Sequence, residues 1–364
     1  MKVLYITNIP VPYTIDFLKC FAQKVELTVV FEARRVKGIS FNWNDDTIEN
    51  FNAIFLSDGE IQEKKTNRRI LKFISKNKYD CVIFGNYAYY TEAIALLKAK
   101  WLQIPYILAI DGGIIKNDKW IKYRIKKFFI AGARCYLSPS LGSDLYLVNY
   151  GADVNDIYRY PFTSLKNEDI LTNVVSYEKK NKLKRYLNIN HEKVILAVGQ
   201  FIHRKGFDIL LESCRYIEEN WGVYIVGGEP PDEYINIVHK HNLNNVHFIN
   251  YQTKEELENY YKLSDIFVLP TRFDIWALVI NEAMSYGLPI ITTDKCSAGL
   301  ELIENNINGY IVPVENIIEL SDKINLILRN EPVAKAMAEN NLKKIRQYTV
   351  EKMTEAYFDV CSKF

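Results

Sequence analysis

The stretch IFVLPTRFDIWALVINEAMSYGLPIITTD, residues Ile266–Asp294, contains a complete strand, loop, helix and strand pattern. Its apolar runs IFVL and PIITT have the length and the β-branched residues of buried strands, and the segment between them has the length of a helix. A helix between two buried strands is typical of a crossover in a parallel α/β sheet. The loop carries Asp274, and the helix expected to begin near Ala277 carries Glu282 in its second turn.

The same alternation runs through most of the chain and predicts two domains. The strand-like runs are VLYIT, LTVVF, CVIFG, PYILAID and CYLSPS before residue 165, and VILAVGQ, VYIVGGE, VHFIN, IFVLPT, PIITTD and GYIVP after residue 190. The interval between the two series is polar and rich in Lys and Asn, which favours a linker. We therefore predict an α/β fold with two doubly wound Rossmann-like domains, at 1–165 and 191–345. The remaining segments are a linker at 166–190 and a helix at 346–364 that can return to the first domain.

The composition is that of a globular protein of 364 residues, 48% hydrophobic and 25% charged. The six Cys are scattered singly and the five His have no metal-ligand spacing, so we expect a reduced, cytosolic chain without a structural metal. The opening MKVLYITNIPVPY is interrupted too early for a signal peptide, and no apolar run of about 20 residues predicts a membrane span. Up to Leu165 there are 23 Lys and Arg against 16 Asp and Glu, although the net charge of the chain is only +2. This small net charge and the lack of a known module argue against nucleic acid as a partner.

A second stretch, VGQFIHRKGFDILLES, predicts an anion site. A strand ends at Gly199, a loop carries Arg204 and Lys205, and Gly206 precedes an amphipathic helix. Guanidinium, ammonium and backbone N–H groups beside a helix start can converge on phosphate oxygens. The alternative for this stretch alone is an ordinary solvated basic loop.

The two carboxylates of the first stretch have a matching interpretation. Asp274 and Glu282 can accept hydrogen bonds from sugar or ribose hydroxyls, while the unpaired N–H groups around Trp276–Val279 can receive anionic oxygens. The alternative is that Asp274 only caps the helix and Glu282 only pairs with a cation at the surface.

Taken together, five segments resemble, in order and spacing, the C-terminal domain of family 4 glycosyltransferases. They are VGQFIHRKGFDILLES, VYIVGG, VHFINYQTKEELENYYKLSDIFVLPT, DIWALVINEAMSYGLPIITTD and NGYIVP, from about Val194 to Val314. Weaker similarity extends to TNIPVPY and YLVNYGADVNDIYRYPF, which resemble bacterial members that build envelope polysaccharide. The resemblance implies a GT-B fold, with two Rossmann-like domains facing each other across a cleft. It also implies retaining transfer of a sugar from a nucleotide diphosphate.

The resemblance also implies roles for individual residues. Lys205 matches the diphosphate-binding Lys, Arg204 its basic partner, Asp274 the acid that contacts the transferred sugar, and Glu282 the acid that holds the ribose diol. The other residues implied to bind the nucleotide sugar are Gly199, Gln200, Asn250, Tyr251, Gln252, Trp276, Ala277, Leu278 and Val279.

Three positions depart from the family pattern. Asp274 stands where Glu is usual, so its carboxylate reaches about one methylene less. Gln200 stands where many members have Arg, which leaves Arg204 to supply the charge. Ala277 replaces a common Gly at the helix start and adds a methyl group where the backbone approaches phosphate.

In the N-terminal domain, LAIDGGI ends a strand with Asp111. The resemblance places a polar residue, often His, at this strand end against the transferred sugar, so Asp111 is a catalytic candidate; a capping role is the alternative. Downstream, Lys116–Leu137 mixes cations with aromatic residues, which predicts a helix on an anionic membrane surface. A solvated crossover helix is the alternative. The cations are Lys119, Lys122, Arg124, Lys126 and Lys127.

We therefore expect a cytoplasmic, peripherally membrane-bound, retaining hexosyltransferase of bacterial capsule or lipopolysaccharide synthesis. It would use a UDP- or GDP-linked sugar, a glycan or lipid-linked acceptor, and no cofactor or metal. Two alternatives remain. One is a GT-B epimerase or phosphorylase, and the other is a degenerate GT-B protein that binds nucleotide sugar or a partner without transfer.

Overall fold

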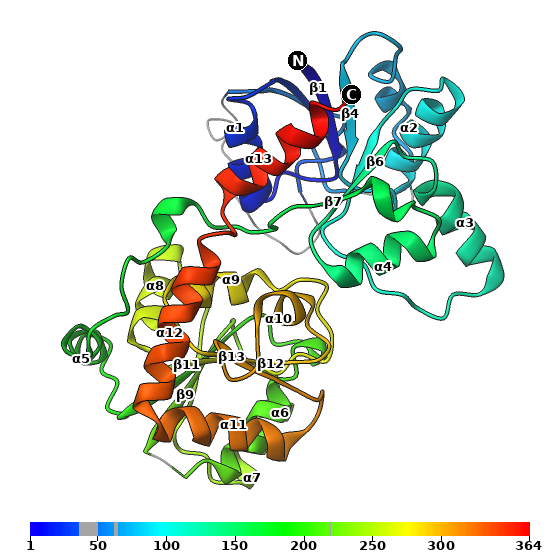
Figure 1. Ribbon diagram of the computed structural model, residues 1–364. Coiled ribbons are helices and arrows are strands. Elements are labelled where there is room, and N and C mark those ends of the chain that lie inside the picture. Colours follow the sequence, from blue (N-terminus) through cyan, green and yellow to red (C-terminus); the bar gives the residue numbers. More distant parts are fainter. Residues whose placement is uncertain (36–49, 62–64, 219) are drawn as a thin grey trace. The chain divides into compact units, whose positions relative to one another are not determined.

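The computed structural model describes residues 1–35, 50–61, 65–218 and 220–364. Over these residues the chain divides into two compact units, Met1–Ser164 with Thr349–Phe364, and Leu165–Tyr348 (Figure 1). Each unit contains one parallel sheet flanked by helices. The predicted α/β fold with two Rossmann-like domains is confirmed.

The first unit has a seven-stranded sheet in the order β3-β2-β1-β4-β5-β6-β7. Every strand pair in it is parallel. Its main elements are β1 (Lys2–Thr7), α1 (Pro12–Phe21), β2 (Glu26–Phe31), β3 (Asn52–Phe55), β4 (Cys81–Phe84), α2 (Tyr90–Trp101), β5 (Ile107–Ala109), α3 (Trp120–Ile130), β6 (Cys135–Ser138), α4 (Leu141–Asn149), β7 (Ile157–Arg159) and α13 (Val350–Cys361).

The second unit has a six-stranded parallel sheet in the order β10-β9-β8-β11-β12-β13. Its main elements are α5 (Tyr177–Tyr186), β8 (Lys193–Val198), α6 (Phe207–Ser213), β9 (Trp221–Val226), α7 (Asp232–Lys240), β10 (Val246–Ile249), α8 (Lys254–Leu263), β11 (Ile266–Leu269), α9 (Leu278–Ser285), β12 (Ile290–Thr293), α10 (Ser297–Leu302), β13 (Gly309–Val312), α11 (Ile317–Arg329) and α12 (Glu331–Ile345).

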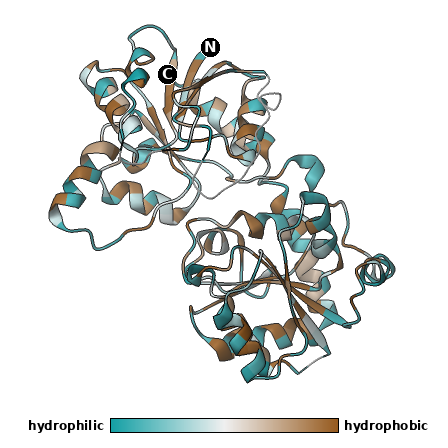
Figure 2. Cartoon of the chain, turned by 180° about the vertical axis from the view of Figure 1, so that it is seen from behind, coloured by the Kyte–Doolittle hydropathy of each residue, from teal (hydrophilic) through white to brown (hydrophobic). Residues whose placement is uncertain are grey.

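Central strands of both sheets are buried along nearly their whole length. All residues of β4, β9, β11 and β12 are buried, and the strands stand out as hydrophobic in Figure 2. Near-continuous apolar runs are typical of parallel strands with both faces covered by helices. Because parallel strands end at the same edge, the loops after β8, β10 and β11 converge there, where open α/β sheets bind ligands.

The C-terminal helix α13 lies in the first unit beside α1 (Figure 1). The ring of Tyr357 on α13 packs against Phe17 on α1, with 4.6 Å between centroids, and against Tyr160, at 5.1 Å. Tyr357 is fully buried. The helix is therefore held by an aromatic cluster rather than by surface contacts.

Residues 166–190 are not the predicted linker between the two units, because they are part of the second unit. They include α5, whose Lys180 donates a hydrogen bond to Asp265 at 2.8 Å. Lys184 donates to the carbonyl of Glu192 at 2.6 Å and is itself buried. The helix has few apolar residues because ion pairs and lysine hydrogen bonds attach it to the sheet, and apolar periodicity does not report such contacts.

Two buried carboxyl groups meet above the first sheet, at Glu32 after β2 and Glu92 in the first turn of α2. The hydroxyl of Thr91 donates to Glu32 at 2.5 Å. Both acids are buried, and no ion pair to either of them occurs among the described residues. Burial, and then the charge of Glu32, raise the pKa of Glu92 to about 8. The raised pKa favours the protonated form of Glu92 at neutral pH.

This pair predicts a pH-dependent stability of the first unit. The pKa of Glu92 is higher in the folded than in the unfolded protein. Glu92 therefore contributes its full stabilisation to the free energy of unfolding below about pH 4.5, and this stabilisation is lost as the pH rises towards about 8. Between pH 5 and pH 8 the wild type should lose about 3 kcal/mol in the free energy of unfolding, measured by urea unfolding. Glu92→Gln should remove much of this loss. The exposed Glu355→Gln is the control. An unchanged pH dependence in Glu92→Gln would show that the pKa of Glu92 is not raised in the folded protein.

Candidate functional site

The loops after β8 and β11 are joined by backbone contacts in the second unit. The carbonyl of Arg204 accepts a hydrogen bond from the N–H of Arg272 and another from the hydroxyl of Thr271, both at 2.8 Å. Gly206 has a φ of +68°, and a Cβ there would lie 2.1 Å from the carbonyl oxygen of Pro270. Only glycine therefore allows the two loops to approach this closely.

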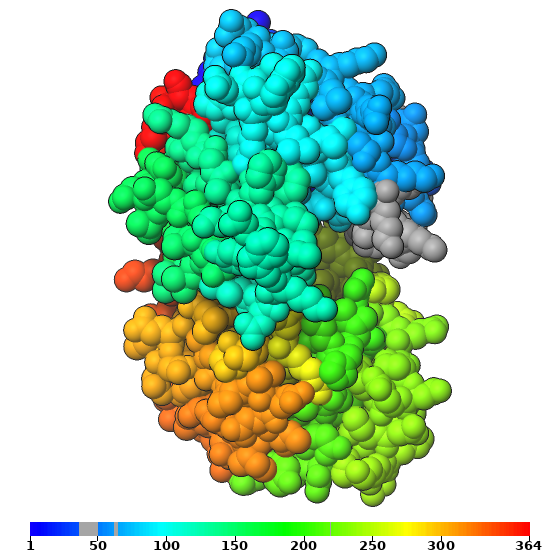
Figure 3. Space-filling model, turned by 90° about the vertical axis from the view of Figure 1, so that its right-hand side faces the viewer, coloured from blue at the N-terminus to red at the C-terminus, as the bar shows by residue number. Residues whose placement is uncertain are grey.

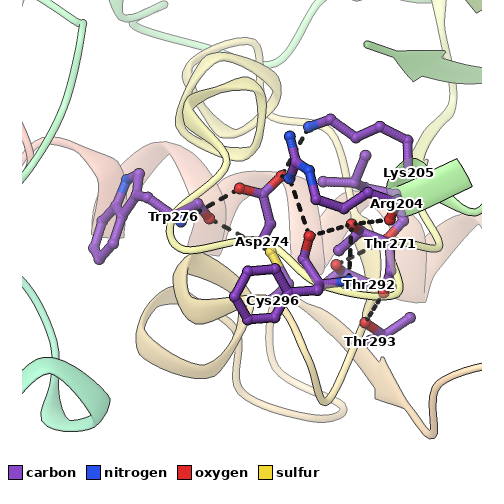
Figure 4. A network of polar contacts seen from close by, with 10 residues as sticks. Arg204, Lys205, Thr271, Asp274, Trp276, Thr292, Thr293 and Cys296 are labelled. Atoms are coloured by element: carbon purple, nitrogen blue, oxygen red, sulfur yellow. Dashed lines mark hydrogen bonds and ion pairs between the residues drawn. The ribbon is translucent and has the colours of Figure 1, made fainter. Parts of the chain in front are cut away.

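Asp274 lies at the centre of a polar network on these loops (Figure 4). Its Oδ2 is 2.8 Å from Nζ of Lys205 and 2.8 Å from Nη1 of Arg204. Asp274 is only 6% exposed, and its pair with Lys205 is shielded from solvent, whereas the Arg204 side chain is 40% exposed. The predicted cations and the first predicted acid are thus brought together, although 69 residues separate Lys205 from Asp274.

The backbone of Asp274 forms hydrogen bonds with the segment that leads into α10. Its N–H donates to the carbonyl of Lys295 at 3.0 Å, and its carbonyl accepts from Ser297 at 3.1 Å. Asp274 does not cap the helix, because Ala277 is the N-cap residue of α9 and no side chain caps that helix. The alternative of Asp274 as the helix cap is therefore wrong: Oδ2 contacts the two cations, and Oδ1 accepts a hydrogen bond from the N–H of Trp276, which precedes the helix, at 3.4 Å.

The start of α9 leaves backbone donors available. Leu278 and Val279 are its first two residues, and no hydrogen bond from either N–H group occurs among the described residues. Trp276 is buried, and its indole N–H donates to Asn281 at 2.9 Å. The N–H groups of the first helical turn and the Lys205 and Arg204 side chains together give a site for an anion.

Ala277 takes up a left-handed conformation, with φ +80° and ψ +75°. This conformation costs a residue with a Cβ about 1–2 kcal/mol, and strain of this kind gathers at functional sites. The departure from glycine noted in the sequence is therefore located at a strained backbone position.

Ala277→Gly is expected to raise the free energy of unfolding of the second unit by about 1 kcal/mol, because relief of strain exceeds the added entropy of the unfolded chain. The matched control is Ala283→Gly in the middle of α9, which should lower it by about 1 kcal/mol. Thermal or urea unfolding of the two variants checks the sign. If both destabilise the protein equally, Ala277 is not strained.

Glu282 lies on α9, partly buried, and its carboxylate is oriented by a tyrosine. The hydroxyl of Tyr261 on α8 donates to Oε2 of Glu282 at 2.9 Å. Burial, followed by the charge of Glu282, raises the pKa of Tyr261 well above its ordinary value, so the hydroxyl stays protonated and remains a donor. A carboxylate can accept several hydrogen bonds, so one oriented in this way is suited to bind hydroxyl groups of a ligand.

Residues Asn250–Gln252 follow β10 at the same edge of the sheet. Tyr251 is 70% exposed, and its ring lies so near Gly228, after β9, that a Cβ there would come within 3.0 Å of it. Gly227 approaches the loop after β8 as well, because a Cβ on it would lie 1.8 Å from the carbonyl oxygen of Gly199. Gln200 follows Gly199 and is exposed. The predicted nucleotide-binding residues therefore border one edge of one sheet.

Asp111 belongs to the first unit, so it is described apart from the other predicted residues. It follows β5, and the hydroxyl of Tyr160 donates to the carbonyl of Ile110 at 2.8 Å and to Oδ1 of Asp111 at 3.3 Å. Tyr160 is buried and thus supports the strand end that carries Asp111.

Two supporting residues were not predicted from the sequence. Tyr261 orients Glu282, and Arg272 forms a bidentate pair with Asp208 at 2.8 and 2.6 Å and contacts Glu315 at 2.7 Å. Arg272 lies between the predicted residues and ties the loop after β11 to α6. The sequence offers one signal for Arg272, its position two residues before Asp274. Its partners could not be predicted, because they are distant in sequence.

The chain is similar to known glycosyltransferases. Residues 178–344 match the family model described as glycosyl transferases group 1. An uncharacterized glycosyltransferase of Haemophilus influenzae is 29% identical over 276 residues, covering 71% of this chain and 76% of the relative. An N,N'-diacetylbacillosaminyl-diphospho-undecaprenol α-1,3-N-acetylgalactosaminyltransferase of Campylobacter jejuni is 24% identical over 280 residues, covering 74% of each chain.

A solved structure supports the fold. Anabaena HepE, solved with UDP and glucose, has a TM-score of 0.78 with 14% identity, and the match covers 100% of both chains. At this identity the likeness concerns the fold alone. The region of residues 178–344 is therefore similar to the group 1 glycosyltransferases, and the chain as a whole has the GT-B fold of solved glycosyltransferases.

Proposed function

We propose that this glycosyltransferase moves a hexose, with retention of configuration, from a nucleotide-diphosphate sugar to a glycan or lipid-linked acceptor of the cell envelope. The observation that supports this most is that Lys205 and Arg204 form ion pairs with Asp274 beside the free N–H groups at the start of α9. Relatives point to the same class, since the C. jejuni transferase is named for an undecaprenol-linked acceptor and HepE was solved with UDP-glucose.

In this proposal the leaving diphosphate is received by Lys205, Arg204 and the N–H groups of Leu278 and Val279. Both cations are already oriented by Asp274, so little reorganisation is needed when negative charge develops on the departing phosphate. These fixed charges would do this without a metal ion. Glu282 would bind the ribose diol, and Asp274 would contact hydroxyls of the transferred sugar.

The proposal assigns no side chain as general base. The acceptor proton would pass to an oxygen of the departing phosphate as the acceptor attacks from the same face. This route leaves Asp274 ionised and paired with its two cations throughout. Asp111 is proposed as a further catalytic residue.

A thermal-shift screen of UDP- and GDP-linked sugars tests the function. A ligand at about 100 times its dissociation constant raises the free energy of unfolding by about 2.7 kcal/mol. We expect one nucleotide sugar to stabilise the protein and to be consumed when an acceptor extract is added. Consumption without acceptor would favour an epimerase, binding without consumption a degenerate protein, and no stabilisation by any donor would contradict the proposal.

We further propose that the first unit rests on the cytoplasmic face of an anionic membrane, through a surface formed by α3 and α4. Helix α3 exposes Trp120 to 73%, and Tyr123 on α3 donates to the carbonyl of Asn149 at the end of α4. No helix in the described part of the chain is long and apolar enough to cross a membrane. Helix α3 lies on the outside of the first unit in Figure 3. The exposed apolar residues of this α3–α4 surface are Trp120, Ile121, Ile125, Phe128, Leu141, Leu145 and Val148.

The structure shows that not all of the predicted cations are available to contact anionic lipids. Lys126 points inwards, where its Nζ is 2.7 Å from Asp118 and bonds to the hydroxyl of Tyr150. Lys119, Lys122 and Lys127 are exposed, although Nζ of Lys122 also lies 3.1 Å from Asp118. Apolar side chains interspersed with exposed lysines are typical of helices that lie in a membrane interface.

Changing Lys119, Lys122 and Lys127 together to Gln is expected to weaken binding to anionic vesicles about 100-fold, since each cation contributes about 1 kcal/mol. Sedimentation with phosphatidylglycerol vesicles, at low and high salt, measures this. The matched control changes Lys72, Lys76 and Lys78, which are exposed elsewhere on the first unit. Equal loss in both triple variants, or no vesicle binding by the wild type, would contradict the membrane role.

A further inference from the structure

Two buried thiols from distant parts of the chain meet inside the first unit. Cys81 is the first residue of β4 and Cys361 is the last residue of α13. Their Sγ atoms are 3.6 Å apart, although 280 positions separate them in sequence. Both side chains are 1% exposed, and both cysteines are free. No other thiol–thiol hydrogen bond occurs among the described residues, so this pairing is specific to these two cysteines.

We propose that Cys81 and Cys361 are a redox modification site, where a reversible disulfide fastens α13 to β4. A disulfide has an S–S length of about 2.05 Å, so closing the present separation requires a combined movement of about 1.5 Å. Helix α13 and the sheet already hold both residues in contact. Rotation of the two side chains with a small shift at the end of α13 supplies a movement of this size.

Reactivity is expected to begin at Cys361. The hydrogen bond to Cys361, and then burial, raise the pKa of Cys81 well above its ordinary value, so Cys81 has very little thiolate in the folded state. Cys361 lies at the end of a helix, and helix ends open at a lower free-energy cost than buried strands. A small oxidant therefore reaches Cys361 in a locally opened state while β4 remains in the sheet.

The chemistry is two successive thiol–disulfide exchanges with the disulfide form of a low-molecular-weight thiol. The Cys361 thiolate attacks that disulfide and releases one small thiol, leaving a mixed disulfide. While the end of α13 is still displaced, Cys81 is no longer bonded to the Cys361 thiol, and its thiolate attacks the Cys361 sulfur and releases the second small thiol. Two protein S–H bonds are lost and one S–S bond forms. The two electrons and the two protons are carried away by the two small thiols.

The crosslink would act on the packing around α13. Tyr357 on this helix packs against Tyr160, which holds the strand end that carries Asp111. A disulfide at Cys361 would keep Tyr357 docked by removing the locally opened state of the last helical turn. Formation of the disulfide does not depend on the proposed function. An effect of the disulfide on activity through Asp111 would rest on that proposed function.

The test is incubation of the full-length protein with oxidised glutathione, followed by alkylation in denaturant and mass spectrometry. We expect four alkylated cysteines instead of the six of the reduced chain, and a crosslinked peptide pair that contains Cys81 and Cys361. Cys135→Ser, which removes another buried thiol of this unit, should leave the crosslink intact. Six alkylated cysteines after oxidation, or a crosslink through Cys135 or Cys20, would overturn the proposal.

A stability measurement adds a second readout. The oxidised wild type should melt about 5 °C or more above the reduced form, and dithiothreitol should reverse the shift. Cys361→Ser and Cys361→Ala should show neither the crosslink nor the shift. Since the crosslinked peptide is read on the wild type, the result stands even if one variant folds poorly. A crosslink without any rise in melting temperature would overturn the fastening of α13.

Discussion

Lys205→Ala is expected to lower the turnover number about 100- to 1,000-fold while weakening donor affinity less than tenfold. The reason is that negative charge on the leaving diphosphate grows towards the transition state, so a fixed cation stabilises that state more than the bound donor. The structure adds a second cause, because Asp274 loses one of the two cations at 2.8 Å that orient its carboxylate.

Steady-state kinetics and direct measurement of donor binding separate these contributions. Lys240→Ala, a change of an exposed lysine at the end of α7, serves as the matched control and should leave both quantities unchanged. Equal losses in turnover and in affinity would show that Lys205 binds only the ground state. An unchanged turnover would remove Lys205 from the catalytic set.

Glu282→Ala is expected to weaken nucleotide binding about 10- to 100-fold, because a hydrogen bond between a carboxylate and a buried hydroxyl contributes about 1.5–3 kcal/mol. Binding of the nucleoside diphosphate itself, measured by calorimetry, isolates this effect from the sugar and the acceptor. Turnover at saturating donor should change much less, since the ribose does not change charge during the reaction.

Tyr261→Phe gives a graded control for this assignment. It removes the hydroxyl that donates to Glu282 at 2.9 Å but keeps the carboxylate and the ring. We expect about a threefold to tenfold loss of nucleotide affinity, smaller than in Glu282→Ala, because the carboxylate remains and only loses the hydroxyl that orients it. Full affinity in a folded Glu282→Ala would contradict the ribose assignment, and a greater loss in Tyr261→Phe than in Glu282→Ala would indicate a structural role.

Much of the fold was predictable because it depends on local patterns. Apolar runs such as those of β9 and β11 mark strands with both faces covered, and the amphipathic segments between them mark crossover helices. The pattern failed at 166–190, where α5 is attached through Lys180 and Lys184 rather than through apolar side chains. Ion pairs leave no periodic signal, so the sequence predicts a linker where the structure has this helix.

The sequence by itself determined the two parallel α/β units and placed the candidate residues at strand ends, because all parallel strands of a sheet end at one edge. Only the tertiary structure decided that Asp274 pairs with Lys205 and Arg204, that Ala277 is left-handed, and that Cys81 meets Cys361. The physical reason is the same in each case. These features depend on side chains and backbone brought together by packing between elements, and local periodicity contains no information about distances between residues that are far apart in the chain.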